Sequence, residues 1–467
     1  MAHVSAFDDD ALGDLDAVGT AEAIATGRIS RLEATDAAIA RLEKVNPHLN
    51  GLAYPSFDRA RARAARPYGG FFDGVPSFIK DNCAVAGMPT QEGTDAWTPT
   101  PAATDGDFAR VFLSTGLNPL GKTQLSEFGF SASAEHPRLG PVRNPWNTDY
   151  TAGASSSGSA ALVAAGVVPI AHANDGGGSI RIPAACNGLV GLKPSRGRLP
   201  LDSGHREMPI RIVANGVVTR SVRDTAAFFR EAERAWRNPK LPAIGDVRNP
   251  SSRRLRVAVI TTSLRRASGP EVAEQTLKTA ALLEGLGHHV SYLDEIPVPD
   301  VFVDDFVLYW ALLAMALVRG GRKRFGPSFD RGRLDNLTLG LDRHASRNLH
   351  RLPLTLARLA TTRRRCAALT REFDVTLTPT LADTTPLIGY LDPTAPYQQI
   401  IERLADWVAF TPLQNVTGDP AISLPLATSA GGLPIGMMFT AATGREGMLL
   451  ELAYELEEAR PFRRISD

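Results

Sequence analysis

The sequence predicts an α/β fold, built as one large domain around a covered central β-sheet. Apolar segments of strand length alternate with helix-length segments along most of the 467 residues. No long polar break divides the chain, and no repeat of the length typical of solenoids or propellers is present. These observations favour strands that lie buried between layers of helices.

Local signals predict the first elements. Ser30 and Glu33 form a capping box, so a helix is expected to begin after Ser30. Residues 74–81, GVPSFIKD, predict a turn followed by an extended apolar segment. A further helix is expected over residues 107–114, ending before Gly116. The first of these helices is expected to carry its apolar face on Leu32, Ala38, Leu42 and Val45.

Residues 116–123, GLNPLGKT, match the phosphate-loop pattern G-x-x-x-x-G-K-[ST]. A phosphate loop follows a buried strand and points its backbone N–H groups at phosphate, whereas this stretch follows an amphipathic helix. Pro119 has no N–H, and Leu117 and Leu120 favour a strand interior. We therefore expect a strand here. A P-loop nucleotide-binding protein is the alternative from another functional class.

Residues 153–197 are rich in Gly, Ser and Ala, and they contain a helix pattern and a strand pattern. Small residues let the backbone approach other backbone or a substrate closely. After residue 250 the expected order is a strand, a helix, a strand, helices to about residue 373, three strands and a closing helix at 446–458. The apolar run 306–318 is too short to cross a bilayer and predicts a buried helix or a pocket wall.

Composition narrows the functional classes. The net charge of +1 provides no field that would gather nucleic acid or an anionic membrane. Cys83, Cys186 and Cys366 form neither a disulfide framework nor a metal-ligand spacing. The acidic N-terminus lacks the apolar core of a signal peptide. We expect a cytoplasmic protein with no membrane span, no metal and no other cofactor.

Residues 174–183, NDGGGSIRIP, place three glycines before Ser179 and a helix start after it. Consecutive glycine N–H groups beside a helix N-terminus form an anion nest, where a serine hydroxyl can act as a nucleophile. The residues alone leave two candidates for the general base. His172 lies nearby in a predicted strand, and Lys80 follows the apolar segment VPSFI. Burial lowers the pKa of a lysine amine and can make it a usable base.

Two long motifs, GASSSGSAALVAAG (153–166) and NDGGGSIRIPAACNGLVGLKPSRGR (174–198), closely resemble the amidase signature family. The segments GVPSFIKDN and LGKTQLSEFG, and the later stretch TPLQNVTGDPAISLPLATSAGGLPIGMM, are similar to the same family. The resemblance extends from about residue 15 to 460. It implies one domain over residues 1–467, with a mixed β-sheet covered by helices on both faces. Within it we expect an N-terminal helical segment (about 15–50), the signature core (about 70–200) and a C-terminal α/β part (about 250–460).

The resemblance also implies a catalytic set of two serines and a lysine. Ser179 matches the nucleophile, Ser155 the bridging serine that follows a cis peptide bond, and Lys80 the base. Gly129 and Phe130 match positions that border the acyl pocket, and Phe130 favours an apolar or aryl acyl group. The N–H groups expected in the oxyanion hole belong to Gly176, Gly177, Gly178 and Ser179.

The implied function is hydrolysis by water of a small-molecule carboxylic amide, linear or cyclic, through an acyl-enzyme on Ser179. The alternative within the superfamily is a glutaminase-type subunit of an aminoacyl-tRNA amidotransferase. The family also allows a homodimer, and no nucleic-acid partner is expected. Asp175 and Arg181 are expected to hold the loop rather than touch substrate. The sequence departs from the usual family motif at Ala154, Ser157, Asn174 and Gly176.

Overall fold

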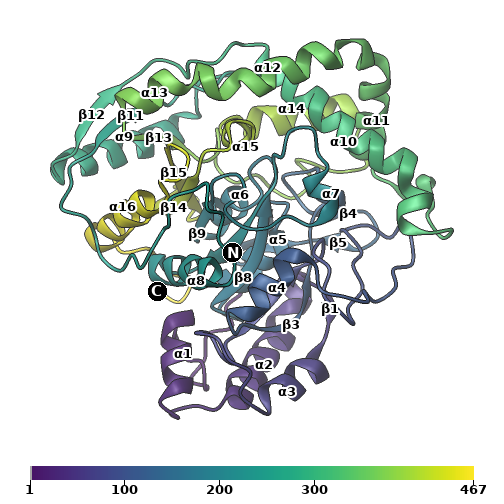
Figure 1. Ribbon diagram of the computed structural model, residues 1–467, viewed down its shortest axis with the longest axis vertical. Helices are drawn as coiled ribbons and strands as arrows, with labels where there is room; N and C mark the ends of the chain where they lie inside the picture. Colours follow the sequence, from purple (N-terminus) through teal and green to yellow (C-terminus); the bar gives the residue numbers. More distant parts are fainter. Residues whose placement is uncertain (1–2) are drawn as a thin grey trace.

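A mixed β-sheet of eight strands forms the centre of the structure (Figure 1). The computed structural model describes residues 3–467. Three strands at one edge run parallel, and all other neighbours in the sheet pair antiparallel. In order across the sheet the strands are β12 (His289–Tyr292), β11 (Arg256–Val259), β13 (Val375–Pro379), β15 (Pro434–Ala441), β14 (Ala421–Thr428), β9 (Val190–Lys193), β10 (Ala214–Thr219) and β8 (Ile170–Asp175).

A smaller sheet of three strands continues the large one beyond β8. Its order is β1 (Leu52–Pro55), β3 (Asn118–Thr123) and β2 (Pro76–Lys80), and β2 packs directly against β8. Side chains bridge the two strands. Ser77 Oγ donates to the Ile170 carbonyl at 2.7 Å, and the Lys80 backbone N–H donates to His172 Nδ1 at 3.3 Å. The last residue of β2 is therefore held beside the segment that leads to the glycine turn.

Helices cover both faces of the large sheet. Alternate residues of each strand point to opposite sides, so buried side chains on each face pack against a helical layer. On β15, Arg181 of α6 (Arg181–Asn187) contacts Met438, whereas Thr276 of α9 (Pro270–Gly285) contacts Met437. Close approach of α6 requires glycine on this face. A Cβ at Gly191 of β9 would lie 2.6 Å from Ala184 Cβ. The predicted α/β fold, with a mixed sheet between helical layers, is confirmed.

The remaining elements surround this framework (Figure 1). The other α-helices are α1 (Ala17–Ala25), α2 (Arg31–Leu49), α3 (Phe57–Ala64), α4 (Asp107–Ser114), α5 (Ser157–Ala164), α7 (Ser203–Arg206), α8 (Val222–Ala235), α10 (Phe302–Phe325), α11 (Asn336–Asn348), α12 (Leu352–Arg365), α13 (Ala367–Glu372), α14 (Tyr397–Trp407), α15 (Pro412–Thr417) and α16 (Glu446–Ala459). Short elements are the strands β4 (Glu135–His136), β5 (Gly140–Pro141), β6 (Arg143–Asn144) and β7 (Asn147–Thr151), and the 3-10 helices η1 (Glu127–Gly129), η2 (Arg331–Arg333) and η3 (Leu349–Arg351).

The capping box at the start of α2 is confirmed. Ser30 Oγ accepts from the Glu33 N–H at 3.1 Å, and the Ser30 N–H donates to the Glu33 carboxylate at 2.7 Å. The apolar face is only partly as predicted, because Leu32 is 41% exposed while Ala38, Leu42 and Val45 are buried. Leu32 lies in the first turn of the helix. The prediction for Leu32 is wrong because helical spacing does not show where the covering layer ends.

Strand β3 replaces the phosphate loop that the pattern at 116–123 describes. Lys122 is buried within β3, and its amine donates to the Cys83 carbonyl at 2.7 Å and to Thr90 Oγ1 at 3.0 Å. Gly121 lies inside the strand, where a Cβ would meet the Tyr54 carbonyl oxygen at 2.1 Å. The strand prediction is confirmed, and the glycine serves strand packing.

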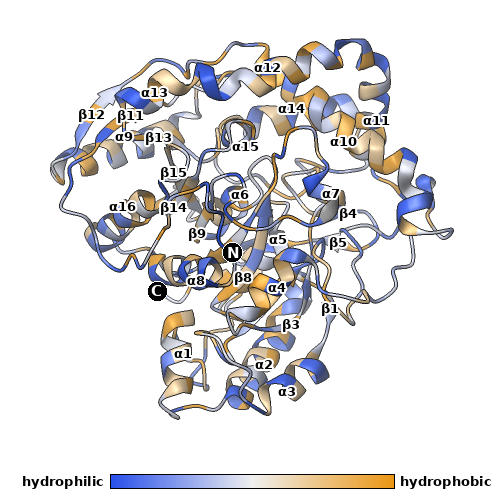
Figure 2. Cartoon of the chain, viewed as in Figure 1, coloured by the Kyte–Doolittle hydropathy of each residue, from blue (hydrophilic) through white to orange (hydrophobic). Residues whose placement is uncertain are grey.

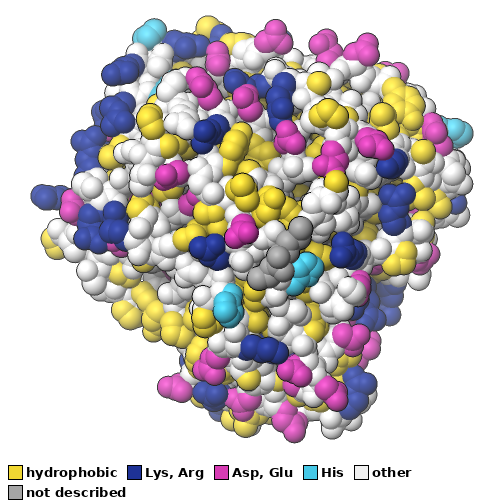
Figure 3. All heavy atoms as spheres, turned by 180° about the vertical axis from the view of Figure 1, so that it is seen from behind, with side chains coloured by type: hydrophobic (Ala, Val, Ile, Leu, Met, Phe, Trp, Pro, Cys, Tyr) yellow, Lys and Arg dark blue, Asp and Glu magenta, His cyan; other side chains and the backbone are white. Residues whose placement is uncertain are grey.

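Helices α10 to α15 form a helical layer beyond the sheet. The apolar run predicted as a buried helix or a pocket wall is part of α10. The outer helices carry both hydrophobic and hydrophilic residues (Figure 2). On the face seen in Figure 3, basic and acidic side chains are both distributed over the surface, in keeping with the net charge of +1. Among residues 3–467 no helix is long and apolar enough to cross a membrane.

We predict that Ser77→Ala destabilises the joint between β2 and β8. The substitution leaves the buried Ile170 carbonyl without its donor, which costs about 1–3 kcal/mol of the free energy of unfolding. Urea denaturation followed by circular dichroism measures this loss. Ser252→Ala, at an exposed bend, is the matched control and should change the free energy little. An unchanged Ser77→Ala protein would show that the joint is held by other contacts.

Candidate active site

Lys80 ends strand β2 and is completely buried. Its Nζ lies 2.7 Å from Ser155 Oγ and 2.7 Å from Asn174 Oδ1. Burial lowers the pKa of Lys80 to about 7, although the negative charge of Asp175 opposes this shift. A substantial fraction of the amine is therefore uncharged near neutral pH. The neighbouring Asp81 does not pair with Lys80, since its carboxylate lies 3.6 Å from Lys122 Nζ.

Ser155 and Ser179 belong to two segments that lie side by side. The peptide bond between Ala154 and Ser155 is cis. Ser156 Oγ donates to the Ser179 carbonyl at 2.6 Å, which joins the start of α5 to the glycine turn. Gly129 approaches from a third segment, and a Cβ there would lie 3.1 Å from Ser155 Oγ. Three distant parts of the sequence thus meet around Ser155.

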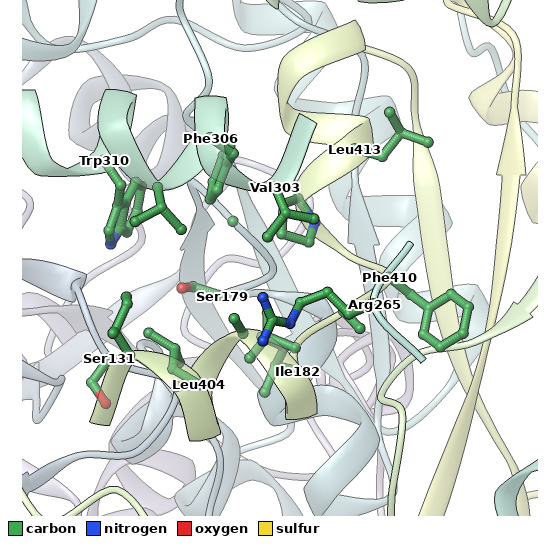
Figure 4. Close-up of a pocket in the computed structure, with 18 of the residues that line it drawn as sticks. Ser131, Ser179, Ile182, Arg265, Val303, Phe306, Trp310, Leu404, Phe410 and Leu413 are labelled. Atoms are coloured by element: carbon green, nitrogen blue, oxygen red, sulfur yellow. The ribbon is translucent and has the colours of Figure 1, made fainter. Parts of the chain in front are cut away.

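Ser179 lies in the turn between β8 and α6, with its hydroxyl at the floor of a pocket (Figure 4). Its side chain is nearly buried. Among residues 3–467, Ser179 Oγ has no hydrogen-bond partner, so the contact from Ser155 to Ser179 is not made in this structure. The structure therefore brings Lys80 and Ser155 into contact, and leaves the Ser179 hydroxyl free beside them.

The glycine turn offers fewer free N–H groups than predicted. The Gly178 N–H donates to Asp175 Oδ1 at 2.7 Å, so it is already engaged and differs from the expectation of an oxyanion donor. Within the described part of the chain, the N–H groups of Gly176, Gly177 and Ser179 have no partner. Gly178 instead determines the shape of the turn. Its φ is +137°, and a Cβ there would lie 2.3 Å from Thr411 Oγ1.

Asp175 and Arg181 hold the glycine turn in place, as the sequence predicted: Asp175 accepts from the N–H groups of the turn, and Arg181 pairs with Asp175. Both are completely buried, and Arg181 Nε donates to Asp175 Oδ2 at 2.9 Å. Burial raises the pKa of Asp175, but Arg181, Lys193 and Asn415 more than offset this effect and lower the pKa to about 2. Asn415 of α15 donates to both the backbone and the side chain of Asp175. This contact was not predicted, because Asn415 is far away in sequence.

His172 does not act on Ser179 in this structure. Its ring packs against Phe108 and Phe112, and Nδ1 accepts from the Lys80 N–H. Burial, together with the charge of Lys80, lowers the pKa of His172 to about 3, so the imidazole is neutral. Of the two candidates for the base, His172 and Lys80, only Lys80 contacts a serine hydroxyl of the site.

The pocket above Ser179 is almost entirely apolar (Figure 4). Phe302, Phe306 and Trp310 are four residues apart on α10, and their rings stack along one face of the helix. The side chains of Ile182 and Leu404 lie on the other side of the space. The lining includes both predicted pocket residues, Gly129 and Phe130.

The glycine turn makes room for the aromatic wall. A Cβ at Gly177 would lie 3.4 Å from Phe306 Cζ, and one at Gly176 would lie 3.3 Å from the Trp310 ring. Arg265 is the charged residue of the lining, and its guanidinium donates to Asp406 at 2.8 Å. The site thus combines a serine hydroxyl, free N–H groups and a largely apolar cavity whose one charged lining residue, Arg265, is paired with Asp406.

Glu127, His136 and Asp335 are the one group among the described residues whose ligand atoms are close enough to hold a metal. His136 Nδ1 accepts from the N–H groups of Arg138 and Leu139, so the hydrogen of the neutral ring is on Nε2. In this tautomer neither ring nitrogen has a free lone pair to ligate a metal, since Nδ1 accepts two hydrogen bonds and Nε2 carries the hydrogen. Burial and the nearby Glu127 raise the pKa of Asp335 to about 8, so the two carboxyl groups do not both ionise at neutral pH.

Comparison with known proteins identifies the family. The family profile described as Amidase matches residues 33–450. "Putative amidase AmiC" of Mycobacterium leprae is 67% identical over 465 residues, covering 100% of this chain and 99% of that protein.

Two solved structures are similar along the whole chain. That of 6-aminohexanoate cyclic dimer hydrolase has a TM-score of 0.85 and 30% identity, covering 97% of this chain and 99% of that one. A bacterial aryl acylamidase of the amidase signature family has a TM-score of 0.85 and 26% identity, covering 96% of each chain. The chain therefore belongs to the amidase signature family and is an amide hydrolase that acts on C–N bonds other than peptide bonds.

Proposed function

We propose that the protein hydrolyses a carboxylic amide through an acyl-enzyme on Ser179, with Lys80 as the base and Ser155 as the proton relay. The observation that carries this proposal is the 2.7 Å contact between Lys80 Nζ and Ser155 Oγ in a fully buried position. An amine with a pKa near 7 can accept a proton at neutral pH and return it later in the same cycle.

The second half of the relay requires Ser179 Oγ to approach Ser155 Oγ. We propose that the Ser179 side chain turns toward Ser155 when substrate is bound. The bond from Ser156 Oγ to the Ser179 carbonyl supports this step, because it already holds the two backbones together. Contacts of this kind often tighten only when substrate is bound.

The chemistry then proceeds in two halves. Lys80 takes the Ser155 proton, Ser155 takes the Ser179 proton, and Ser179 Oγ attacks the amide carbonyl carbon. The N–H groups of Gly176, Gly177 and Ser179 are the donors proposed for the oxyanion. The lysine ammonium returns its proton through Ser155 to the amide nitrogen, the C–N bond breaks and the amine leaves. Water attacks the acyl-enzyme by the same relay, releasing the carboxylic acid and restoring Ser179.

The lining of the pocket favours a substrate with an uncharged, apolar acyl group, either aliphatic or aryl. Burying a charge against Phe306, Trp310 and Ile182 without a partner would be costly. The similarity to an aryl acylamidase is in keeping with an aryl amine as the leaving group. Glutamine, the substrate of the alternative function, carries an ammonium and a carboxylate. The lining offers it only Arg265, which already pairs with Asp406. A cytoplasmic location and a homodimer stay predictions.

Removing the catalytic groups tests the mechanism directly. Ser179→Ala should abolish both turnover and labelling by a fluorophosphonate probe. Lys80→Ala should lower kcat/KM about 100- to 10,000-fold near neutral pH, the range typical for loss of a general base. Retained labelling of Ser179→Ala would place the nucleophile elsewhere.

The pH profile tests the identity of the base. Only the neutral amine accepts a proton, so kcat/KM should fall as the pH decreases through about 7, the pKa of Lys80. Burial also lowers the pKa of Lys193 to about 7, but its amine donates to the Pro194 carbonyl at 2.8 Å and contacts neither serine. Lys193→Met should therefore keep the acid limb. Loss of that limb in Lys193→Met would overturn the assignment to Lys80.

The shape of the glycine turn should be as important as its N–H groups. Gly178→Ala places a Cβ against Thr411 and Ile182 at a φ that other residues rarely adopt. We expect kcat/KM to fall by about 100-fold, comparable to loss of one oxyanion donor. Gly285→Ala is the matched control, since nothing lies within 4 Å of its added Cβ. Equal activity of the two variants would contradict this role for the turn.

Substrate selectivity follows from the largely apolar lining, in which Arg265 is already paired with Asp406. The kcat/KM for hexanoyl or benzoyl p-nitroanilide should exceed that for glutamine by at least about 100-fold, because a charged acyl group lacks partners in the pocket. Phe306→Ala should lower kcat/KM for the benzoyl substrate more than for the acetyl analogue. Comparable hydrolysis of glutamine, measured as ammonia release, would favour the glutaminase alternative.

A further inference from the structure

The Lys80 amine has a second neighbour that the catalytic set does not include. Asn174, the fifth residue of β8, offers its Oδ1 at 2.7 Å from Lys80 Nζ and its backbone carbonyl oxygen at 3.4 Å. Asn174 is nearly buried, and it is one of the positions where this sequence departs from the usual motif. Both acceptors belong to one residue at the end of the strand beside β2.

Asn82 determines which atom of the Asn174 amide faces the lysine. Asn174 Nδ2 donates to Asn82 Oδ1 at 2.9 Å, and Asn82 Nδ2 donates to Asn174 Oδ1 at 3.3 Å. This reciprocal pair of amides holds the oxygen of Asn174 toward Lys80 Nζ. If the amide turned over, its NH₂ group would face the amine instead, and a hydrogen bond would be lost.

A neutral lysine amine has two hydrogens and one lone pair. When the two oxygens of Asn174 accept the two hydrogens, the lone pair is left for the third neighbour, the hydroxyl of Ser155. Proton transfer from Ser155 needs this arrangement, because a hydrogen of the amine directed at Ser155 Oγ would block it. The direction of the lone pair therefore depends on Asn174.

We propose that Asn174, held in place by Asn82, is a positioning residue that aims the lone pair of Lys80 at Ser155. The inference rests on the proposed function, since it matters only if Lys80 is the base. It adds to the catalytic set an amide pair that acts through the lysine and does not touch the substrate.

The other charged or titratable groups near the amine are Asp175, His172 and His205. The pKa of Asp175 is about 2, so it is ionised throughout the useful pH range. Burial lowers the pKa of His172 to about 3 and that of His205 to about 4, so both are neutral above pH 5. None of these three changes charge where Lys80 titrates. Burial raises the pKa of the adjacent Asp81 to about 7 and lowers that of Lys193 to about 7, so the assignment of the acid limb to Lys80 rests on how the limb shifts in the variants below.

The decisive variant is Asn174→Asp, which has the same shape and adds a negative charge at the amine. A carboxylate next to an ammonium favours the charged lysine, so the acid midpoint of kcat/KM should rise by about 1–3 pH units. Activity should recover above the new midpoint, where the amine is neutral again. Asn174→Leu should lower kcat about 10- to 100-fold, with KM unchanged and no rise in the midpoint. Because a carboxylate at this distance shifts the midpoint in any case, the positioning role is tested by Asn174→Leu: a merely structural role would leave kcat of the folded variant unchanged.

Asn144→Asp is the matched control, because Asn144 is a buried asparagine whose amide donates to the carbonyls of Thr151 and Cys186 and does not contact Lys80. Its acid midpoint should equal that of the parent enzyme. If Asn174→Asp does not fold, Asn82→Asp at a half-buried position should move the midpoint in the same direction by a smaller amount. An unchanged midpoint in the folded variants, with Lys80→Ala still inactive, would overturn this inference alone. An active Lys80→Ala enzyme would overturn the proposed function.

Discussion

Burial of the Lys80 amine against Ser155 is the constraint on which the rest of the site depends. A lysine in water keeps its proton and cannot serve as a base at neutral pH. Complete removal from solvent lowers the pKa of Lys80 to about 7, and the nearby Asp175 keeps the shift from being larger. The balance between these two effects makes the amine able both to take and to return a proton.

The sheet provides this burial by bringing two strands together that are not joined by a backbone ladder. Strands β2 and β8 are bridged by Ser77 and by His172, and the ends of these strands carry Lys80 and Asn174. The nearby ion pair of Asp175 and Arg181 is also fully buried. Such a pair costs desolvation and is maintained only where further hydrogen bonds satisfy it, which Asn415 and the amides of the turn do here. The same groups that satisfy the ion pair therefore hold the glycine turn.

Most of the pocket lining comes from parts of the chain other than those that carry Lys80, Ser155 and Ser179. Its aromatic wall comes from α10, more than 100 residues after Ser179, and its other side comes from α6 and α14. Lys80 lies at a strand end and Ser155 and Ser179 lie in turns, whereas the aromatic wall is contributed by the outer helical layer. The aromatic wall and the proposed catalytic set thus come from different parts of the chain, and the glycine turn borders both.

Local patterns in the sequence determined much of this protein: the α/β class, the capping box of α2, the strand at 118–123 and the glycine turn around Ser179. The resemblance of its motifs to a known family also placed Lys80, Ser155 and Ser179 in one site. Only the tertiary structure decided the rest. Leu32 is exposed, the Gly178 N–H is occupied by Asp175, and Asn82, Asn174 and Asn415 take part in the site. The physical reason is that the hydrogen-bond partners and the burial of a side chain depend on which segments, distant in sequence, pack together. A local sequence pattern contains no information about those contacts.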